Sequence, residues 1–172
     1  MAVPEIFHTI EQTSLSTWLR ETPSIFGYYF ILLFHAFGMA FVVGGNAVVD
    51  LRLLGIVPAL PLKPLKRLFP IMWVGFWMNF ASGIFLVIAY PTKEFTNIDF
   101  YCKLTFVTLG IITMYRLDHR VFEDASLSEA AMIVNGKTLA KWSLVFWIAA
   151  VTAGRMLSET AIFQTYGHPW GG

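Results

Sequence analysis

Residues 25–55, IFGYYFILLFHAFGMAFVVGGNAVVDLRLLG, decide the fold of this chain. From Ile25 to Val49 the stretch carries no charged residue, and His35 and Asn46 are its only strongly polar side chains. A helix of about 20 apolar residues crosses the hydrocarbon core of a bilayer. A lone segment of this length can pair its backbone groups in lipid only as a helix. The sequence therefore predicts a transmembrane helix over about residues 24–50.

Three further apolar runs follow, at about residues 69–90, 100–117 and 141–163. The composition agrees with a membrane protein, because 56% of the residues are hydrophobic and only 13% are charged. No soluble domain and no internal repeat is visible. We expect an all-α fold: residues 1–172 form a single transmembrane domain, an integral membrane four-helix bundle.

The polar segments predict helices at the membrane surface. Within residues 1–21, apolar side chains recur every three or four positions, which is typical of an amphipathic surface helix; they are Ile6, Phe7, Ile10, Leu15, Trp18 and Leu19. Thr22 and Pro23 are typical of a helix N-cap and first turn, and are expected to start the first span. Residues 118–140 are the longest polar stretch and are expected to contain another surface helix.

Basic residues are distributed unequally between the two sides of the predicted bundle. One side carries Arg52, Lys63, Lys66, Arg67, Arg116, Arg120, Lys137 and Lys141, and the other carries Arg20, Lys93 and Lys103. Since basic loops stay in the cytoplasm, we expect a multi-pass protein of the bacterial inner (cytoplasmic) membrane with both termini in the periplasm.

Small residues recur every four positions on two of the spans. These rows are Ala36, Ala40 and Gly44, and Ala150, Gly154 and Ser158. Such rows allow helices to approach closely in lipid. We expect them to pack inside the bundle, with a dimer interface as the alternative.

Several polar residues are expected at a similar depth in the outer half of the membrane. At about 1.5 Å per residue, His35 lies roughly 15 Å and Arg155 roughly 12 Å from the outer helix ends. Arg155 can pair with Glu159, four residues later. Asn79, Ser82, Thr105 and Thr108 fall in the same layer. Because polar groups are costly in lipid unless they face protein, the pattern predicts one shared pocket.

His35 has three interpretations. It is a buried histidine hydrogen-bonded to Asn79 or to a serine or threonine, an axial ligand of a b-type haem, or a group that handles protons or metal ions. In the haem interpretation, Arg155 is a candidate partner for a propionate, although it needs only Glu159 if no haem is present.

A second haem ligand is harder to assign. His119 is a candidate metal ligand together with His35, but on the helix rise it lies roughly 13 Å deeper, in a cluster expected at the cytoplasmic interface. Lys103, Met39, a ligand from a partner subunit and a five-coordinate haem are the alternatives. Asp50 and Arg52 are expected to pair where the first span leaves the bilayer.

Other chemistries lack their sequence motifs. The chain has one cysteine, Cys102, and no phosphate-binding glycine loop, GxSxG elbow or HExxH motif. A basic patch with interleaved aromatic residues is also missing, so nucleic-acid binding is not expected. The protein is not expected to be an enzyme on its own.

A set of short motifs resembles a family of small four-span bacterial membrane proteins, uncharacterised and loosely grouped with the copper-resistance D-like proteins. The motifs are His35-Ala36-Phe37-Gly38, Gly44 to Gly55 with the run DLRLLG, Pro70 with Gly75-Phe76, Gly83, Phe100 with Lys103, Ser143-Leu144 with Trp147, and Gly154-Arg155. The resemblance implies a four-helix membrane fold. By analogy with small four-helix b-type cytochromes, it implies a haem at His35.

The leading functional hypothesis is therefore an accessory or electron-transfer subunit of a bacterial inner-membrane complex. It binds haem b near His35, with Arg155, Asn79 and Lys103 as further cofactor-binding candidates. Its partners are the lipid bilayer and other membrane subunits or further copies of the chain. The alternatives are a cofactor-free structural or assembly subunit and a copper or proton permeation module.

Overall fold

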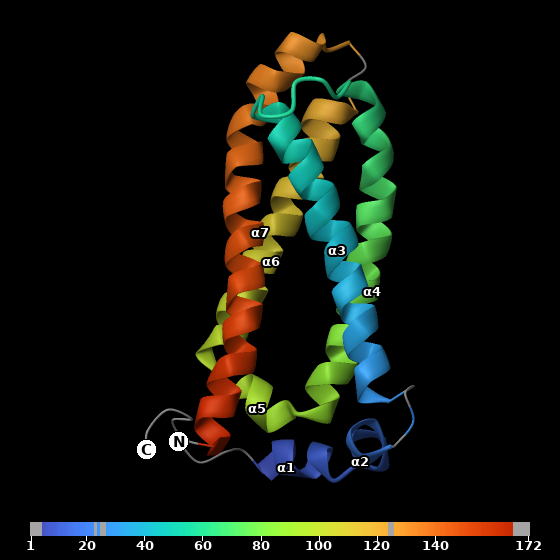
Figure 1. The fold of residues 1–172 in the computed structure, drawn as a ribbon, viewed down its shortest axis with the longest axis vertical. Coiled ribbons are helices and arrows are strands. Elements are labelled where there is room, and N and C mark those ends of the chain that lie inside the picture. The colour runs from blue at the N-terminus through green and yellow to red at the C-terminus, as the bar shows by residue number, and fades with distance from the viewer. Residues whose placement is uncertain (1–4, 23, 25–26, 124–125, 167–172) are drawn as a thin grey trace.

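The computed structural model describes residues 5–22, 24, 27–123 and 126–166, with side chains up to residue 158. Every regular element in these ranges is helical, which confirms the all-α prediction (Figure 1). The elements in chain order are α1 (Glu5–Glu11), α2 (Ser14–Glu21), α3 (Tyr28–Leu53), η1 (Lys63–Arg67), α4 (Leu68–Ala89), α5 (Pro91–Phe95), α6 (Ile98–Leu117), η2 (Asp118–Phe122) and α7 (Glu129–Tyr166).

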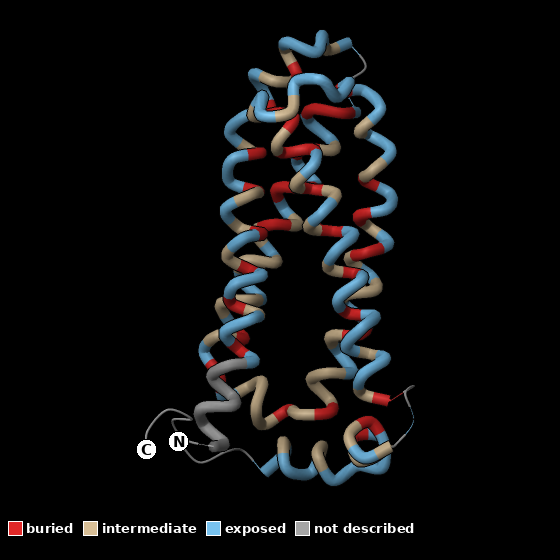
Figure 2. Tube along the Cα trace, viewed as in Figure 1, coloured by how far each residue is buried: buried red, intermediate tan, exposed pale blue. Residues whose placement is uncertain are grey.

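The long helices are arranged as two antiparallel pairs. Helix α3 packs mainly on α4, α6 packs mainly on α7, and contacts between α3 and α7 join the pairs. The pairs lie close together at the end that carries η1 and η2, and they diverge toward the end that carries α5 (Figure 1). The largest buried cluster accordingly lies near the η1–η2 end, where Leu53, Phe69, Met72, Met114 and Leu117 are almost fully buried (Figure 2).

Within the described residues, three helices are long and apolar enough to cross a membrane: Tyr28–Leu53, Lys63–Ala89 and Ile98–Phe122. Their outer faces expose large apolar side chains, among them Leu33, Phe37, Trp77 and Phe80. Such extensive apolar surfaces are uncommon on soluble monomers. The structure is thus compatible with a membrane protein, and the membrane location itself stays a prediction.

Two predicted element boundaries are wrong. Thr22 does not start the first long helix but ends α2, where its N–H donates to the carbonyl of Trp18; α3 begins at Tyr28. Pro23 lies outside the described residues. Residues 118–140 do not form a separate surface helix, because they contain the π-helical turn η2 and the first turns of the continuous helix α7.

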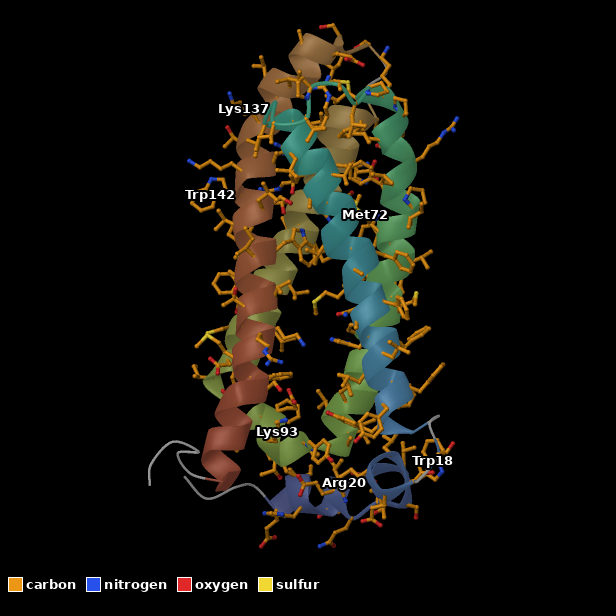
Figure 3. The ribbon with its side chains drawn as sticks, in the orientation of Figure 1. Trp18, Arg20, Met72, Lys93, Lys137 and Trp142 are labelled. Carbon is orange, nitrogen blue, oxygen red and sulfur yellow. The ribbon has the colours of Figure 1, made fainter. Side chains whose placement is uncertain are left out.

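The N-terminal segment forms two short helices instead of the one expected, and they pack on the α5 end of the molecule. Leu19 of α2 is buried. The Arg20 guanidinium donates to the carbonyl of Ala89, 3.0 Å away at the end of α4, and to the carbonyl of Glu11 at 2.7 Å. A cation that binds terminal carbonyls stabilises a helix C-terminus. Figure 3 shows Arg20 and Lys93 at this end and Lys137 near the opposite one.

The backbones of α3 and α4 approach closely at Gly38 of α3 and Gly75 of α4. A Cβ atom on Gly38 would lie 2.7 Å from the backbone nitrogen of Asn79 and 2.8 Å from the carbonyl oxygen of Gly75. By contrast, the predicted row of Ala36, Ala40 and Gly44 is exposed, so its expected packing inside the bundle is wrong. In the second row, Ala150 is buried against α3, whereas Ser158 is exposed.

We expect Gly38→Ala to destabilise the fold by about 1–3 kcal/mol, because the new methyl group would meet the backbone of α4. Gly44→Ala is the matched control on the same helix, since no atom lies within 4 Å of its Cβ position. The control should keep or slightly raise the melting temperature, because alanine favours helix over glycine. Thermal unfolding in detergent measures both, and equal melting temperatures for the two variants would contradict the assigned contact.

Candidate functional site

A cavity of about 390 Å³ lies among α3, α4, α5 and α6, toward the α5 end. Its walls are mostly aliphatic and aromatic, and its polar or charged side chains are His35, Asn79 and Lys103. The apolar walls are built by Phe76, Phe80, Ile84, Leu86, Val87, Ile88, Phe95, Phe100, Leu104 and Val107. A pocket of this size, apolar with a few convergent polar groups, is typical of a small-molecule or cofactor site.

His35 is held in a defined orientation by α4. Its Nδ1 lies 3.0 Å from the Ser82 hydroxyl oxygen. That hydroxyl donates to carbonyls of its own helix, at 2.6 Å to Met78 and 3.1 Å to Asn79. Since its single hydrogen is used there, the oxygen accepts from Nδ1–H. This arrangement assigns the hydrogen of the neutral imidazole to Nδ1 and leaves the lone pair on Nε2.

The Nε2 atom is the chemically available atom of the site. It is buried and has no hydrogen-bond partner among the described residues. Buried polar atoms are nearly always paired, so such an atom calls for an explanation. A neutral imidazole nitrogen with a lone pair is a common metal ligand.

Asn79 joins the two helices at the level of His35. Its Nδ2 donates to the carbonyl oxygen of His35 at 2.9 Å. One predicted alternative for His35 was a buried histidine hydrogen-bonded to a neighbouring serine. It accounts for Nδ1, which bonds to Ser82, but not for Nε2. The amide of Asn79 pairs with the backbone of His35 and not with its ring.

Lys103 supplies positive charge from α6. It lines the cavity, and its ammonium is close enough for its charge to act on the His35 imidazole. Its side-chain carbons run along Gly154 of α7, where a Cβ would lie 3.6 Å away. Near the same end, burial raises the pKa of Glu94 in α5, and the positive charges of Lys103 and Lys93 act in the opposite direction.

Other predicted site residues lie elsewhere. Arg155 is on the exposed surface of α7 and does not line the cavity, and the side chain of Glu159 lies outside the described residues. Thr105 and Thr108 are exposed and donate to carbonyls of α6 itself. His35, Asn79 and Lys103 therefore line one cavity and Ser82 bonds to His35 behind it, whereas the two threonines and Arg155 do not line it.

His119 lies in η2, just beyond the end of α6 that is farther from Lys103. Its Nδ1 is hydrogen-bonded to the carboxylate of Glu123, and its ring packs on Tyr115. In the described part of the chain, no group of three or more His, Cys, Asp or Glu side chains is placed to hold a metal ion. His35 and His119 therefore do not share one site.

The predictions from sequence did not include the walls of the cavity or Glu94. Helices α4 and α6 carry apolar residues on all their faces, so their composition does not distinguish a cavity wall from a lipid-facing surface. Glu94 follows Pro91, a signal for a helix start, and this is the feature that could have placed it on the same short helix as Phe95, which lines the cavity.

No family model, no curated protein and no solved structure matches this chain. The candidate site is therefore defined by its own geometry: a fixed imidazole with an unpaired Nε2, an apolar cavity and one lysine.

Proposed function

We propose that this protein is a haem-binding, electron-transfer subunit of a bacterial inner-membrane complex, with a b-type haem in the cavity and His35 as an axial ligand. The observation that carries the proposal is the buried Nε2 of His35, which has no hydrogen-bond partner in the part of the chain that the structure describes and belongs to a side chain lining a cavity of about 390 Å³. Iron coordination would pair this nitrogen, and imidazole is a common axial ligand of haem.

The hydrogen bond between His35 and Ser82 supports a ligand role. Histidines that bind metals usually donate their other ring N–H to a neighbouring acceptor, which fixes the tautomer and the orientation of the ring. In this chain the acceptor is the Ser82 oxygen, at 3.0 Å from Nδ1.

The other lining residues suit the two parts of a haem. Aromatic and aliphatic walls match the apolar macrocycle, and the Lys103 ammonium can pair with a propionate carboxylate. Among the described lining residues His35 is the only histidine, so the proposed iron has one histidine ligand. Lys103 is the second candidate ligand; if it pairs with a propionate instead, the iron is five-coordinate. Arg155 stays a candidate partner for a propionate at the surface.

In this proposal α3, α4, α6 and α7 all cross the membrane, with α1 and α2 at the periplasmic surface. The basic residues of the η1–η2 end then face the cytoplasm, as expected from the charge bias. In this proposal the electron donor and acceptor are other membrane subunits.

A spectrum tests the proposal directly. We expect the protein purified from haem-supplemented cells to show the Soret and α bands of a b-type haem, and His35→Ala to lose them, because the iron loses its histidine. His119→Ala is the matched control and should keep the spectrum. A wild-type protein that stays colourless after haem titration, or an unchanged spectrum in His35→Ala, would contradict haem ligation; the first result would favour the cofactor-free structural subunit.

The role of Ser82 gives a second prediction. Ser82→Ala removes the acceptor for Nδ1–H and should weaken haem binding about 10–100-fold, as losses of such supporting hydrogen bonds do. Thr108→Ala removes an exposed hydroxyl that bonds only to its own helix and should leave the affinity unchanged. Haem titration followed by absorbance measures both, and equal affinities would show that the tautomer is not set by Ser82.

A further inference from the structure

A second polar group lies deeper in the molecule, where α3 and α7 pack antiparallel. Asn46 and Asp50 are one turn apart on α3, and Ser143 and Trp147 are one turn apart on α7. Their relative exposures are 1%, 0%, 0% and 5%, so all four side chains are removed from the surface. None of them lines the His35 cavity.

These side chains carry five buried polar atoms without a hydrogen-bond partner among the described residues. The atoms are both carboxylate oxygens of Asp50, Oδ1 of Asn46, Oγ of Ser143 and Nε1 of Trp147. Only the amide nitrogen of Asn46 is used, in a bond of 2.8 Å to the carbonyl of Val42. The Ser143 hydroxyl is the polar group next to the Asp50 carboxyl, although the two do not meet hydrogen-bond geometry.

No described cation compensates Asp50. The predicted pair with Arg52 is wrong: Arg52 forms an ion pair of 3.6 Å with Glu129 of α7 and also donates to the carbonyl of Leu60. No other described Lys, Arg or His lies within ion-pair distance of Asp50. Toward α6, the buried Thr113 donates to the carbonyls of Leu109 and Gly110. Toward α4 the neighbourhood is apolar, with Met72 against Gly45 of α3.

We propose that Asp50, together with Asn46 and Ser143, binds one monovalent cation, a proton or a sodium ion. A buried carboxylate without a partner is very costly, and one positive charge removes that cost. A divalent ion would leave a net charge in the interior and is disfavoured for the same reason. The three side chains present oxygen atoms, the ligands that hard cations prefer.

A small cavity of about 20 Å³ lies on the His35 side of this group. Its α3 residues, Met39, Val42 and Val43, fall between His35 and Asn46, and Trp147 of α7 also lines it. That volume holds about one water molecule. Beyond Asp50, Leu53 and Ala140 are fully buried and close the interface toward the η1–η2 end. Because that end is closed, we expect the cation to exchange on the side of the molecule where the His35 cavity lies.

The test is infrared spectroscopy of the full-length protein, comparing wild type with Asp50→Asn. In sodium-free choline buffer we expect the difference spectrum to contain the C=O band of a carboxylic acid. If the band persists when NaCl is added, the cation is a proton. If NaCl but not choline chloride converts it to a carboxylate, the cation is sodium. An Asp50 that is ionised in both buffers and unaffected by sodium would overturn the proposal.

Two further variants test the assignment of the infrared band to Asp50. Asp118→Asn, at the surface turn η2, should keep the Asp50 band. Ser143→Ala retains Asp50 and keeps the test informative if Asp50→Asn does not fold. It should shift the frequency of the acid band or raise the half-saturating sodium concentration about tenfold, since a supporting ligand is lost. An unchanged band and sodium response would overturn the proposed site. The haem test can fail without affecting this result, because the two sites use different residues.

Discussion

The contact between Gly38 and Gly75 is the constraint on which the candidate site depends. Only two glycines allow the backbones of α3 and α4 to approach as closely as they do here. His35 lies one turn before Gly38 on α3, and Asn79 and Ser82 lie one and two turns after Gly75 on α4. The close approach therefore brings the His35 ring within reach of the Ser82 hydroxyl, and the carbonyl of His35 within reach of the Asn79 amide. A wider separation would break both bonds together.

The divergence of the helix pairs separates the molecule into two environments. Near η1 and η2 the pairs pack tightly, and the polar groups there are enclosed by protein. Toward α5 the pairs separate (Figure 1). The cavity at His35 lies toward this end, lined by residues of α3, α4, α5 and α6. Helices α1 and α2 add contacts at this end, because Arg20 binds the last carbonyl of α4. The same bundle thus contains an apolar cavity at His35, toward α5, and a buried polar group around Asp50, nearer η1 and η2.

The sequence predicts where the long helices lie along the chain, but not which face of each helix packs against its neighbours. Apolar runs are long enough to require helices, so predicted spans such as 69–90 match observed helices such as Leu68–Ala89 closely. Which face of each helix turns inward could not be predicted, because a helix that is apolar all round has no polar face to reveal its orientation. This is why the exposed row of Ala36, Ala40 and Gly44 is not distinguishable from a buried one in the sequence. Asp50 and Arg52, two residues apart on α3, face different directions, so Arg52 pairs with Glu129 instead. His35 and Asn79 were identified as site candidates because isolated polar residues in a span must face protein.

The two candidate sites share a helix but are electrically almost independent. Asp50 follows His35 by about 15 residues, which is about 22 Å along α3 at the rise of an α-helix. Two unit charges at that separation interact by roughly 0.7 kcal/mol at an effective dielectric constant of about 20, a factor of about three in an equilibrium constant. Lys103 lines both the large and the small cavity, and its charge acts on the His35 imidazole. A change of charge at the His35 cavity would therefore shift the occupancy at Asp50 only slightly, so strong coupling between them would require a movement of α3 against α7 and not electrostatics alone.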